Sequence, residues 1–403
     1  MMLKKEIIDI VLDQKNALKN IDLGIPRSEL KEVELTDSFA YVISGIRRCG
    51  KSVFLQQIRS NQKSWAYFNF EDTRLNAFSV ADFTKLQEAL IEVYGNIDIF
   101  FFDEIQNVKK WEIFVRQLLD NKKKVIITGS NASLLSKELG TRLTGRHLRK
   151  EMFPFSYNEF LKFTSQKSGE VSFKEYLVAG GFPEFLKYKN EEILQELLNN
   201  IIYRDIIVRH HLKESKTIKD LAVYLLSNIG KEYSYNNLKK LFEVGSINTI
   251  ISYISYFEDS YLLFSINRFD YSIKKQLISQ KKIYAIDNGF AKANSLSFSK
   301  DEGRMLENLV FINLRNHFES IYYYKDQNLE CDFIIKEKEK ITYAFQVCLD
   351  LSADNKVREI NGLKLAMSKF KLNKGTILTL NQEDTIKEKD LVIQIVPVWK
   401  WKL

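Results

Sequence analysis

The sequence is poor in the residues that mark several classes of protein. Only four of its 403 residues are Pro while 45% are hydrophobic, so most of the chain is expected to be packed and ordered. The three cysteines, Cys49, Cys331 and Cys348, lie far apart and form no C-x-x-C pair. That spacing argues against a disulfide framework or a zinc site, and it fits a reducing cytosol.

Long apolar runs are also missing. No stretch approaches the roughly eighteen apolar residues of a membrane-spanning helix. The N-terminal segment alternates charged and apolar side chains, so it lacks the continuous apolar core of a secretory signal. We therefore expect a cytoplasmic protein without a membrane partner.

The length and charge set broad limits on the architecture and on the partners. A chain of 403 residues is too long for one hydrophobic core and should divide into two to four domains. Its net charge of +8 permits an anionic partner such as nucleic acid but does not require one.

One glycine-bracketed loop matches the phosphate-binding pattern G-x-x-x-x-G-K-[ST]. An apolar strand (41–44) precedes it and a helical segment (53–58) follows, which is the context that a phosphate loop needs. Lys51 would reach the β and γ phosphates of a nucleotide, and Ser52 would ligate Mg²⁺. The predicted nucleotide-binding residues are Gly45, Ile46, Arg47, Arg48, Cys49, Gly50, Lys51, Ser52 and Val53.

Acidic and polar side chains follow two further predicted strands. The apolar run 97–102 delivers Asp103 and Glu104 to the carboxyl edge of a parallel sheet. Asp103 would hold Mg²⁺ through water, and Glu104 would take a proton from the attacking water. Strand 124–128 leads to Ser130, which would orient that water or sense the γ phosphate, or would cap the next helix together with Asn131.

Two arginines remain open to interpretation. Arg146, in the run 142–146, would stabilise charge on the transferred phosphoryl group, in cis or from a neighbouring subunit, or is a surface arginine. Arg27 is expected to contact either the nucleotide or solvent, and contact with solvent is the favoured interpretation. No N-K-x-D guanine signal is present, so adenine is the expected base.

These motifs together resemble the prokaryotic AAA-type ATPases that carry a DUF4143 C-terminal region. The resemblance rests on the phosphate loop, the Asp103-Glu104 strand end, 128–130, 143–146, 153–160, 180–183 and 203–206, and it covers nearly the whole chain. It implies that Arg146 is the family's arginine finger and that Ser130 is its sensor residue.

The segment 218–290 has the pattern of a winged helix-turn-helix. Helical stretches 218–229, 235–242 and 247–257 precede extended stretches 261–266 and 282–286. Residues 204–282 hold thirteen Lys or Arg against eight Asp or Glu. The candidate DNA contacts are Asn248, Thr249, Ser252, Tyr253, Lys274, Lys275, Lys281 and Lys282. The alternative is a protein-contact or nucleotide-lid module with a solvated basic face.

The last hundred residues resemble a restriction-endonuclease-like core. A helix carries Glu307 and a strand carries Asp332, but Gln346 and Cys348 stand where E-x-K would bind metal and activate water. Gln is a weak metal ligand, and Cys cannot replace the amine. Glu330 is expected on the opposite face of the strand from Asp332. We therefore predict a retained fold without nuclease chemistry.

The predicted architecture is an α/β P-loop ATPase domain with a parallel sheet (1–160), followed by three further parts. These are a helical lid or linker (161–217), a winged helix-turn-helix (218–290) and an inactive restriction-endonuclease-like α/β domain (300–403). We expect a Mg²⁺-dependent ATPase that couples its ATP state to double-stranded DNA, as a homo-oligomer if Arg146 acts in trans. The alternatives are a protein-interaction switch with slow hydrolysis and an ATP-dependent nuclease using Glu307 and Asp332.

Overall fold

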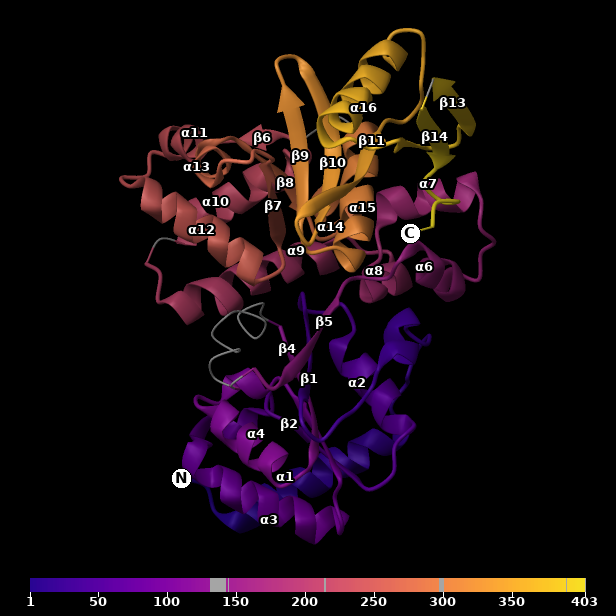
Figure 1. The fold of residues 1–403 in the computed structure, drawn as a ribbon. Helices are drawn as coiled ribbons and strands as arrows, with labels where there is room; N and C mark the ends of the chain where they lie inside the picture. The colour runs from indigo at the N-terminus through magenta and orange to yellow at the C-terminus, as the bar shows by residue number, and fades with distance from the viewer. Residues whose placement is uncertain (131–142, 144, 214, 297–300, 389, 403) are drawn as a thin grey trace. The chain divides into compact units, whose positions relative to one another are not determined.

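The computed structural model describes residues 1–130, 143, 145–213, 215–296, 301–388 and 390–402. The chain forms two compact units, Met1–Phe153 and Pro154–Leu403 (Figure 1). Within the described ranges, no helix combines the length and the apolar composition that crossing a membrane requires.

A five-stranded parallel sheet forms the centre of the N-terminal unit. Its order is β2-β3-β4-β1-β5, and every neighbouring pair is parallel. All six residues of β1 are buried, as expected for a central strand covered on both faces. The strands are β1 (Ala40–Gly45), β2 (Trp65–Asn69), β3 (Ile99–Asp103), β4 (Lys124–Gly129) and β5 (His147–Met152).

Helices cover both faces of this sheet. They are α1 (Lys4–Ala17), α2 (Lys51–Ser60), α3 (Phe83–Tyr94) and α4 (Trp111–Asp120). Helix α2 lies on the opposite side of the sheet from α3 and α4 (Figure 1). Phe83 of α3 stacks on Phe114 of α4 with ring centroids 4.6 Å apart, so aromatic packing joins these two helices. Because all five strands are parallel, their carboxyl ends lie at one edge of the sheet.

The C-terminal unit begins with a helical segment, in agreement with the prediction of a mostly helical stretch. It contains α6 (Tyr157–Thr164), α7 (Glu170–Ala179), α8 (Pro183–Tyr188), α9 (Glu192–Asn200) and a π-helical stretch (Ile201–Val208).

The next segment alternates helices with short strands. Its elements are α10 (Ser215–Leu226), β6 (Glu232–Tyr233), α11 (Tyr235–Leu241), α12 (Ile247–Asp259), β7 (Leu263–Arg268), α13 (Ile273–Ile278) and β8 (Lys281–Ala285). Strand β8 pairs antiparallel with both β6 and β7. Ser246 caps α12 by accepting a hydrogen bond from the Asn248 N–H at 3.2 Å.

The remaining chain completes a mixed sheet of nine strands with the order β13-β14-β12-β11-β10-β9-β7-β8-β6. The additional elements are α14 (Asn288–Ala293), α15 (Glu302–His317), β9 (Ile321–Asp326), β10 (Leu329–Glu337), β11 (Lys340–Val347), α16 (Lys356–Phe370), β12 (Lys374–Thr379), β13 (Asp384–Glu388) and β14 (Leu391–Pro397). Strands β7 and β9 pair in parallel, with Asn267 opposite Tyr322. The segments predicted as separate domains 218–290 and 300–403 therefore share one sheet.

Two helices pack on opposite faces of the middle of this sheet. Phe311 of α15 lies 6.3 Å from the ring of Phe333 on β10. Leu363 of α16 instead joins the buried cluster that contains Ile334, the next residue of the same strand. Because successive side chains of a strand point to opposite faces, α15 and α16 enclose β10 between them.

Candidate functional site

The predicted phosphate loop connects the buried strand β1 to helix α2. Gly45 has φ 155°, and a Cβ there would lie 2.2 Å from the carbonyl oxygen of Met152 on β5. Gly50 adopts a left-handed conformation with φ 103°, which favours glycine. The two bracketing glycines are therefore required by a close backbone approach and by backbone conformation, respectively.

Lys51 is buried at the start of α2. Its ammonium donates to the carbonyls of Gly45 at 3.0 Å and Ile46 at 3.1 Å. The Glu104 carboxylate lies 3.8 Å from the same nitrogen. The lysine is thus folded over its own loop, beside the acid that directly follows β3.

Thr128 links the two acids at the end of β3, and sequence reasoning did not assign it a role. Its buried hydroxyl donates to Asp103 Oδ1 and accepts from the Glu104 N–H at 3.0 Å. Tyr67 donates to the other Asp103 oxygen at 3.2 Å. Glu104 itself has φ 51° and accepts a hydrogen bond from Gln106. Three neighbouring strands therefore fix the orientation of this pair of carboxylates.

The electrostatic setting of Asp103 matches a ligand for a hard cation. Burial and the neighbouring Glu104 carboxylate raise the pKa of the Asp103 carboxyl. Hydrogen bonds from Thr128 and Ser52 oppose that increase in the pKa. Hydroxyl and carboxylate oxygens are the donors that Mg²⁺ prefers, so Ser52 and Asp103 fit the metal that the phosphate loop implies.

The expectation that Arg27 faces solvent is wrong, because only 4% of this residue is exposed. Its guanidinium donates to the carbonyls of Cys49 at 3.3 Å and Phe153 at 2.8 Å, and its backbone N–H donates to Gln57 at 3.1 Å. Arg27 thus supports the phosphate loop from the side of the protein interior. The Cys49 thiol is buried beside it, and burial raises its pKa.

Two residues with predicted catalytic roles lie at different ends of the sheet. Ser130 is buried just after the carboxyl end of β4, whereas Asn131, Arg142 and Thr144 lie outside the described residues. Arg146 precedes β5, and Ala40 at the start of β1 donates to its carbonyl. Met152, beside the loop, is the sixth residue after Arg146 along the strand, a span of roughly 20 Å.

The contacts of Arg146 also point away from the loop. Its guanidinium binds Asp120 at 2.5 Å and the carbonyl of Ser38 at 3.1 Å. The option that Arg146 completes the site of its own chain is therefore wrong, and only an action on a neighbouring chain stays a prediction.

The predicted DNA contacts divide into exposed and buried residues. Asn248, Lys274 and Lys275 are exposed, and Thr249, Ser252 and Lys281 are partly exposed. Tyr253 is wrong as a DNA contact because it belongs to the buried side of α12. Lys282 is also wrong as a phosphate contact, since it is 4% exposed and paired with acids.

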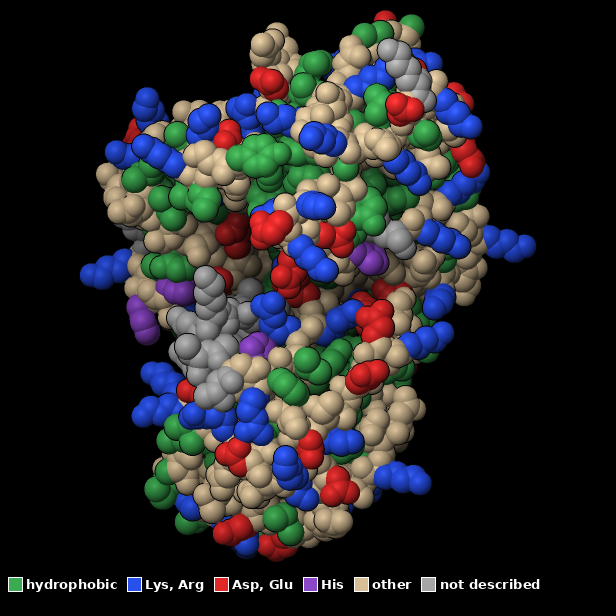
Figure 2. Space-filling model, in the orientation of Figure 1, with side chains coloured by type: hydrophobic (Ala, Val, Ile, Leu, Met, Phe, Trp, Pro, Cys, Tyr) green, Lys and Arg blue, Asp and Glu red, His purple; other side chains and the backbone are tan. Residues whose placement is uncertain are grey.

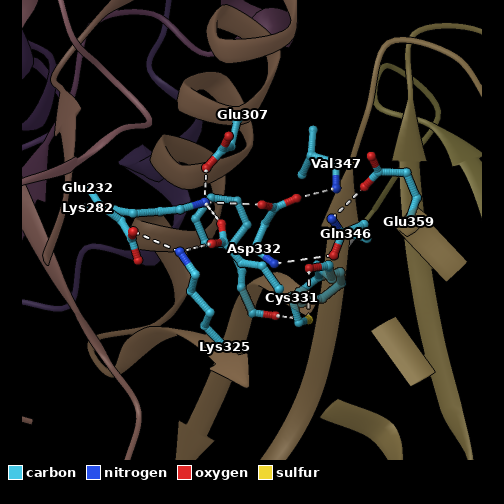
Figure 3. A network of polar contacts seen from close by, with 12 residues as sticks. Glu232, Lys282, Glu307, Lys325, Cys331, Asp332, Gln346, Val347 and Glu359 are labelled. Carbon is cyan, nitrogen blue, oxygen red and sulfur yellow. Dashed lines mark hydrogen bonds and ion pairs between the residues drawn. The ribbon is translucent and has the colours of Figure 1, made fainter. Parts of the chain in front are cut away.

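The acids of the endonuclease-like segment surround that buried lysine (Figure 3). The Lys282 ammonium lies 2.9 Å from Glu307, 2.6 Å from Glu330 and 3.2 Å from Asp332. The expectation that Glu330 faces away from Asp332 is wrong, because residues two apart in a strand share a face. Among the residues that the structure describes, no group of three or more His, Cys, Asp or Glu is arranged to hold a metal ion.

Gln346 and Cys348 stand at the E-x-K positions. Among the contacts of the described residues, neither side chain contacts Lys282. Gln346 donates to Glu359 at 2.7 Å and accepts from the Asp332 N–H at 3.3 Å. Cys348 is buried, and burial raises the pKa of its thiol to about 12. Cys348 lines an open cavity of about 710 Å³, together with Asp301, Glu302, Gly303, Arg304, Glu307, Val347, Leu349, Asp350, Asn355, Arg358 and Glu359.

Matches to known protein families divide the chain into three consecutive parts. Residues 37–161 match an AAA domain, residues 170–301 a domain of unknown function (DUF8612), and residues 302–401 a domain of unknown function (DUF4143). Among solved structures, the chain is similar to the Aeropyrum pernix ORC1 protein in complex with DNA. That match has 9% identity and a TM-score of 0.31, and it covers 73% of this chain and 92% of the other.

Two relatives match over most of their length. An uncharacterized protein of Methanocaldococcus jannaschii is 38% identical, with 100% of this chain and 96% of the relative covered. An uncharacterized protein of Haemophilus influenzae is 31% identical, with 78% of this chain and 83% of the relative covered. The chain therefore belongs to the AAA-domain proteins that carry a DUF4143 C-terminal region.

Proposed function

We propose that this chain is a cytoplasmic, Mg²⁺-dependent ATPase. One observation carries the proposal: Lys51, Ser52, Asp103 and Glu104 converge at the carboxyl edge of the sheet, beside a loop whose glycines have the required conformations. The loop amides and the Lys51 ammonium would bind the phosphates. Ser52 and Asp103 would hold Mg²⁺, which supplies positive charge next to the phosphoryl group when bound.

The remaining residues take roles around the attacking water. Glu104 would accept the proton of that water, and the Thr128 hydroxyl would hold the Glu104 backbone in place. Ser130 would sense the γ phosphate from the end of β4. Because Arg146 faces away from its own loop, the arginine finger role requires a neighbouring copy of the chain, and hence a homo-oligomer.

Titration calorimetry with Mg²⁺ and ATP tests the nucleotide site. The wild-type chain is expected to release or absorb heat on binding, and Lys51→Met is expected to abolish that binding because the phosphate charge loses its ammonium partner. Lys63→Met, which alters an exposed lysine close by in sequence, is the matched control. A wild-type chain that gives no heat with millimolar nucleotide contradicts the proposal.

We further propose that ATP binding and hydrolysis are coupled to a DNA-binding winged helix. Helices α10, α11 and α12, with the three-stranded ribbon β6, β8 and β7, support that interpretation. Lys and Arg side chains are interspersed with hydrophobic ones over the region of α11 and α13 (Figure 2). Retention on duplex DNA that falls steeply between low and physiological salt is the expected result.

A second candidate function is a nucleotide-dependent switch that contacts protein. It is favoured by the apolar residues exposed at and around α13, namely Tyr271, Ile273, Leu277 and Ile278. Protein interfaces bury such side chains, whereas phosphate contacts need cations. Absence of any duplex DNA binding at low salt would favour the switch over the DNA-binding proposal.

A further inference from the structure

The phosphate loop is bonded to the residues that end the N-terminal unit. The buried Arg27 guanidinium donates to the carbonyl of Cys49 in the loop at 3.3 Å and to the carbonyl of Phe153 at 2.8 Å. The Cys49 thiol donates to the neighbouring carbonyl, that of Met152, at 3.6 Å. Phe153 is the last residue of the N-terminal unit, and Pro154 begins the C-terminal unit. The loop is therefore connected by hydrogen bonds to the point where the chain leaves its unit.

One peptide group of the loop has its two ends on opposite sides. A trans peptide directs its carbonyl and its N–H in opposite directions. Because the Cys49 carbonyl faces Arg27, the N–H of Gly50 in the same peptide group points away from Arg27. Gly50 directly precedes α2, and the amides at the start of a helix are the ones that bind phosphate. A phosphate that attracts the Gly50 N–H therefore acts on the peptide group that Arg27 holds from behind.

Arginine suits this connection better than lysine does. Its planar guanidinium carries N–H donors in a fixed arrangement, so it holds two carbonyls at set positions. Its backbone N–H donates to Gln57 of α2 at 3.1 Å, and the Gln57 amide donates to the carbonyls of Leu23 and Ile25, each at 2.7 Å. The Glu29 carboxylate lies 3.8 Å from the guanidinium. The segment that carries Arg27 is thus fixed to the helix that follows the loop.

The C-terminal unit holds the other side of this junction. The N–H of Phe155 donates to the carbonyl of Gly181 at 2.8 Å, and the Tyr176 hydroxyl donates to the Phe155 carbonyl at 2.8 Å. A Cβ at Gly181 would lie 2.1 Å from that carbonyl oxygen, so the two backbones leave no space for a side chain. The Gly181 N–H donates at 2.7 Å to Asp287, which caps α14 shortly after β8. Only Pro154 therefore separates a carbonyl held in one unit from an amide held in the other.

We propose that Arg27 is a positioning residue that couples the occupancy of the phosphate loop to the C-terminal unit. Phosphate binding moves the Cys49 carbonyl, and Arg27 transfers that displacement to the carbonyl of Phe153. Pro154, whose ring fixes its φ angle, transfers it to Phe155. This inference rests on the proposed ATP binding, and it adds the route by which the nucleotide state reaches the segment of β8 and α14.

Hydrogen exchange of the full chain, with and without Mg²⁺ and a non-hydrolysable ATP analogue, tests this coupling. In the wild-type chain the analogue is expected to protect the loop (45–53) and to change exchange about fivefold or more in the peptide that contains Phe155. Arg27→Gln is expected to keep the loop protection and to lose the response at Phe155. Arg74→Gln removes a more exposed arginine, bonded to Asp13 and Asp72, and as the matched control should keep both responses.

A second variant interrupts the same route from the C-terminal side if Arg27→Gln does not fold. Tyr176→Phe removes the hydroxyl that holds the Phe155 carbonyl, so the nucleotide response at Phe155 should fall while the loop protection remains. Tyr157→Phe, whose hydroxyl donates to Gly169 instead, should preserve that response. A full response at Phe155 in Tyr176→Phe would then overturn the coupling.

The same data separate failure of the coupling from failure of ATP binding. Loop protection without a response at Phe155 in the wild-type chain overturns the coupling and leaves ATP binding intact. An equal response at Phe155 in Arg27→Gln and in the wild-type chain also overturns it. Absence of loop protection contradicts the proposed ATP binding itself, and the coupling then falls with it.

Discussion

The two units each place a buried lysine beside carboxylates, but the lysines are held differently. Lys51 donates to two backbone carbonyls and lies 3.8 Å from the nearer acid, Glu104. Lys282 instead contacts three carboxylates at 2.6 to 3.2 Å. The first ammonium can exchange weak neutral partners for an anionic ligand, whereas the second would have to give up strong charged partners.

The difference shows how the surroundings decide what a set of charged residues does. The phosphate loop provides amides and a helix N-terminus that attract an anion, so its lysine adds to an anion site. The endonuclease-like segment provides three acids around its lysine, so the lysine serves as their counter-ion. Residue type alone does not separate a ligand site from an internal ion pair.

The largest expected effect comes from removing the internal counter-ion. Lys282→Met should lower the free energy of unfolding by about 3–5 kcal/mol in metal-free buffer, because three buried acids lose their partner. Lys325→Met removes a partly exposed lysine next to the same acids and should cost about 1 kcal/mol or less. Denaturant unfolding measures both values. Equal losses for the two variants would contradict the comparison.

The next effect concerns catalysis in the N-terminal unit. Glu104→Gln should lower ATP turnover by about 10²-fold or more while ATP binding is retained, because the amide cannot accept the proton. Glu88→Gln on the surface of α3 is the matched control and should leave turnover unchanged. Steady-state phosphate release and titration calorimetry separate turnover from binding. Wild-type turnover in Glu104→Gln would show that another group is the base.

A smaller effect is expected from the hydroxyl that joins the two acids. Thr128→Val should cost about 1–3 kcal/mol of unfolding free energy, because Asp103 and the Glu104 N–H both lose a buried partner. Thr128→Ser keeps the hydroxyl and should retain most of the stability and turnover. The free energies come from denaturant unfolding. A stable and fully active Thr128→Val chain would remove the linking role proposed for this residue.

The smallest effect concerns the exposed basic residues of α13. The double variant Lys274→Gln and Lys275→Gln should reduce the salt dependence of DNA binding by about 2 in the slope of log K against log salt. Binding should weaken similarly on unrelated duplex sequences, since phosphate contacts carry no sequence information. Fluorescence anisotropy at several salt concentrations measures the slope. An unchanged slope would assign these lysines to another partner.

The sequence predicted the parts of the site that local patterns encode. The phosphate loop and the acids at the end of β3 each depend on neighbouring residues, so a linear pattern is enough to locate them. Tyr253 could have been recognised as buried, because it lies with Ile250, Ile254 and Phe257 at the spacing of one helix face.

Other features depend on partners that are distant in the chain. Lys282 meets acids 25 to 50 residues away, and Thr128 meets Asp103 25 residues away. Arg27 reaches the carbonyl of Phe153, which is 126 residues away. No local spacing signals such pairs, so their roles could be seen only once the strands were placed beside one another.

The parallel pairing of β7 with β9 has a practical consequence for dissecting the protein. A fragment that starts at residue 302, where the DUF4143 match begins, would keep β10 beside β9 but remove β7, and would leave amides and carbonyls unpaired on that side of β9. Such an open edge invites strand addition between copies and precipitation during purification. Fragments that begin near Pro154 keep the nine strands together.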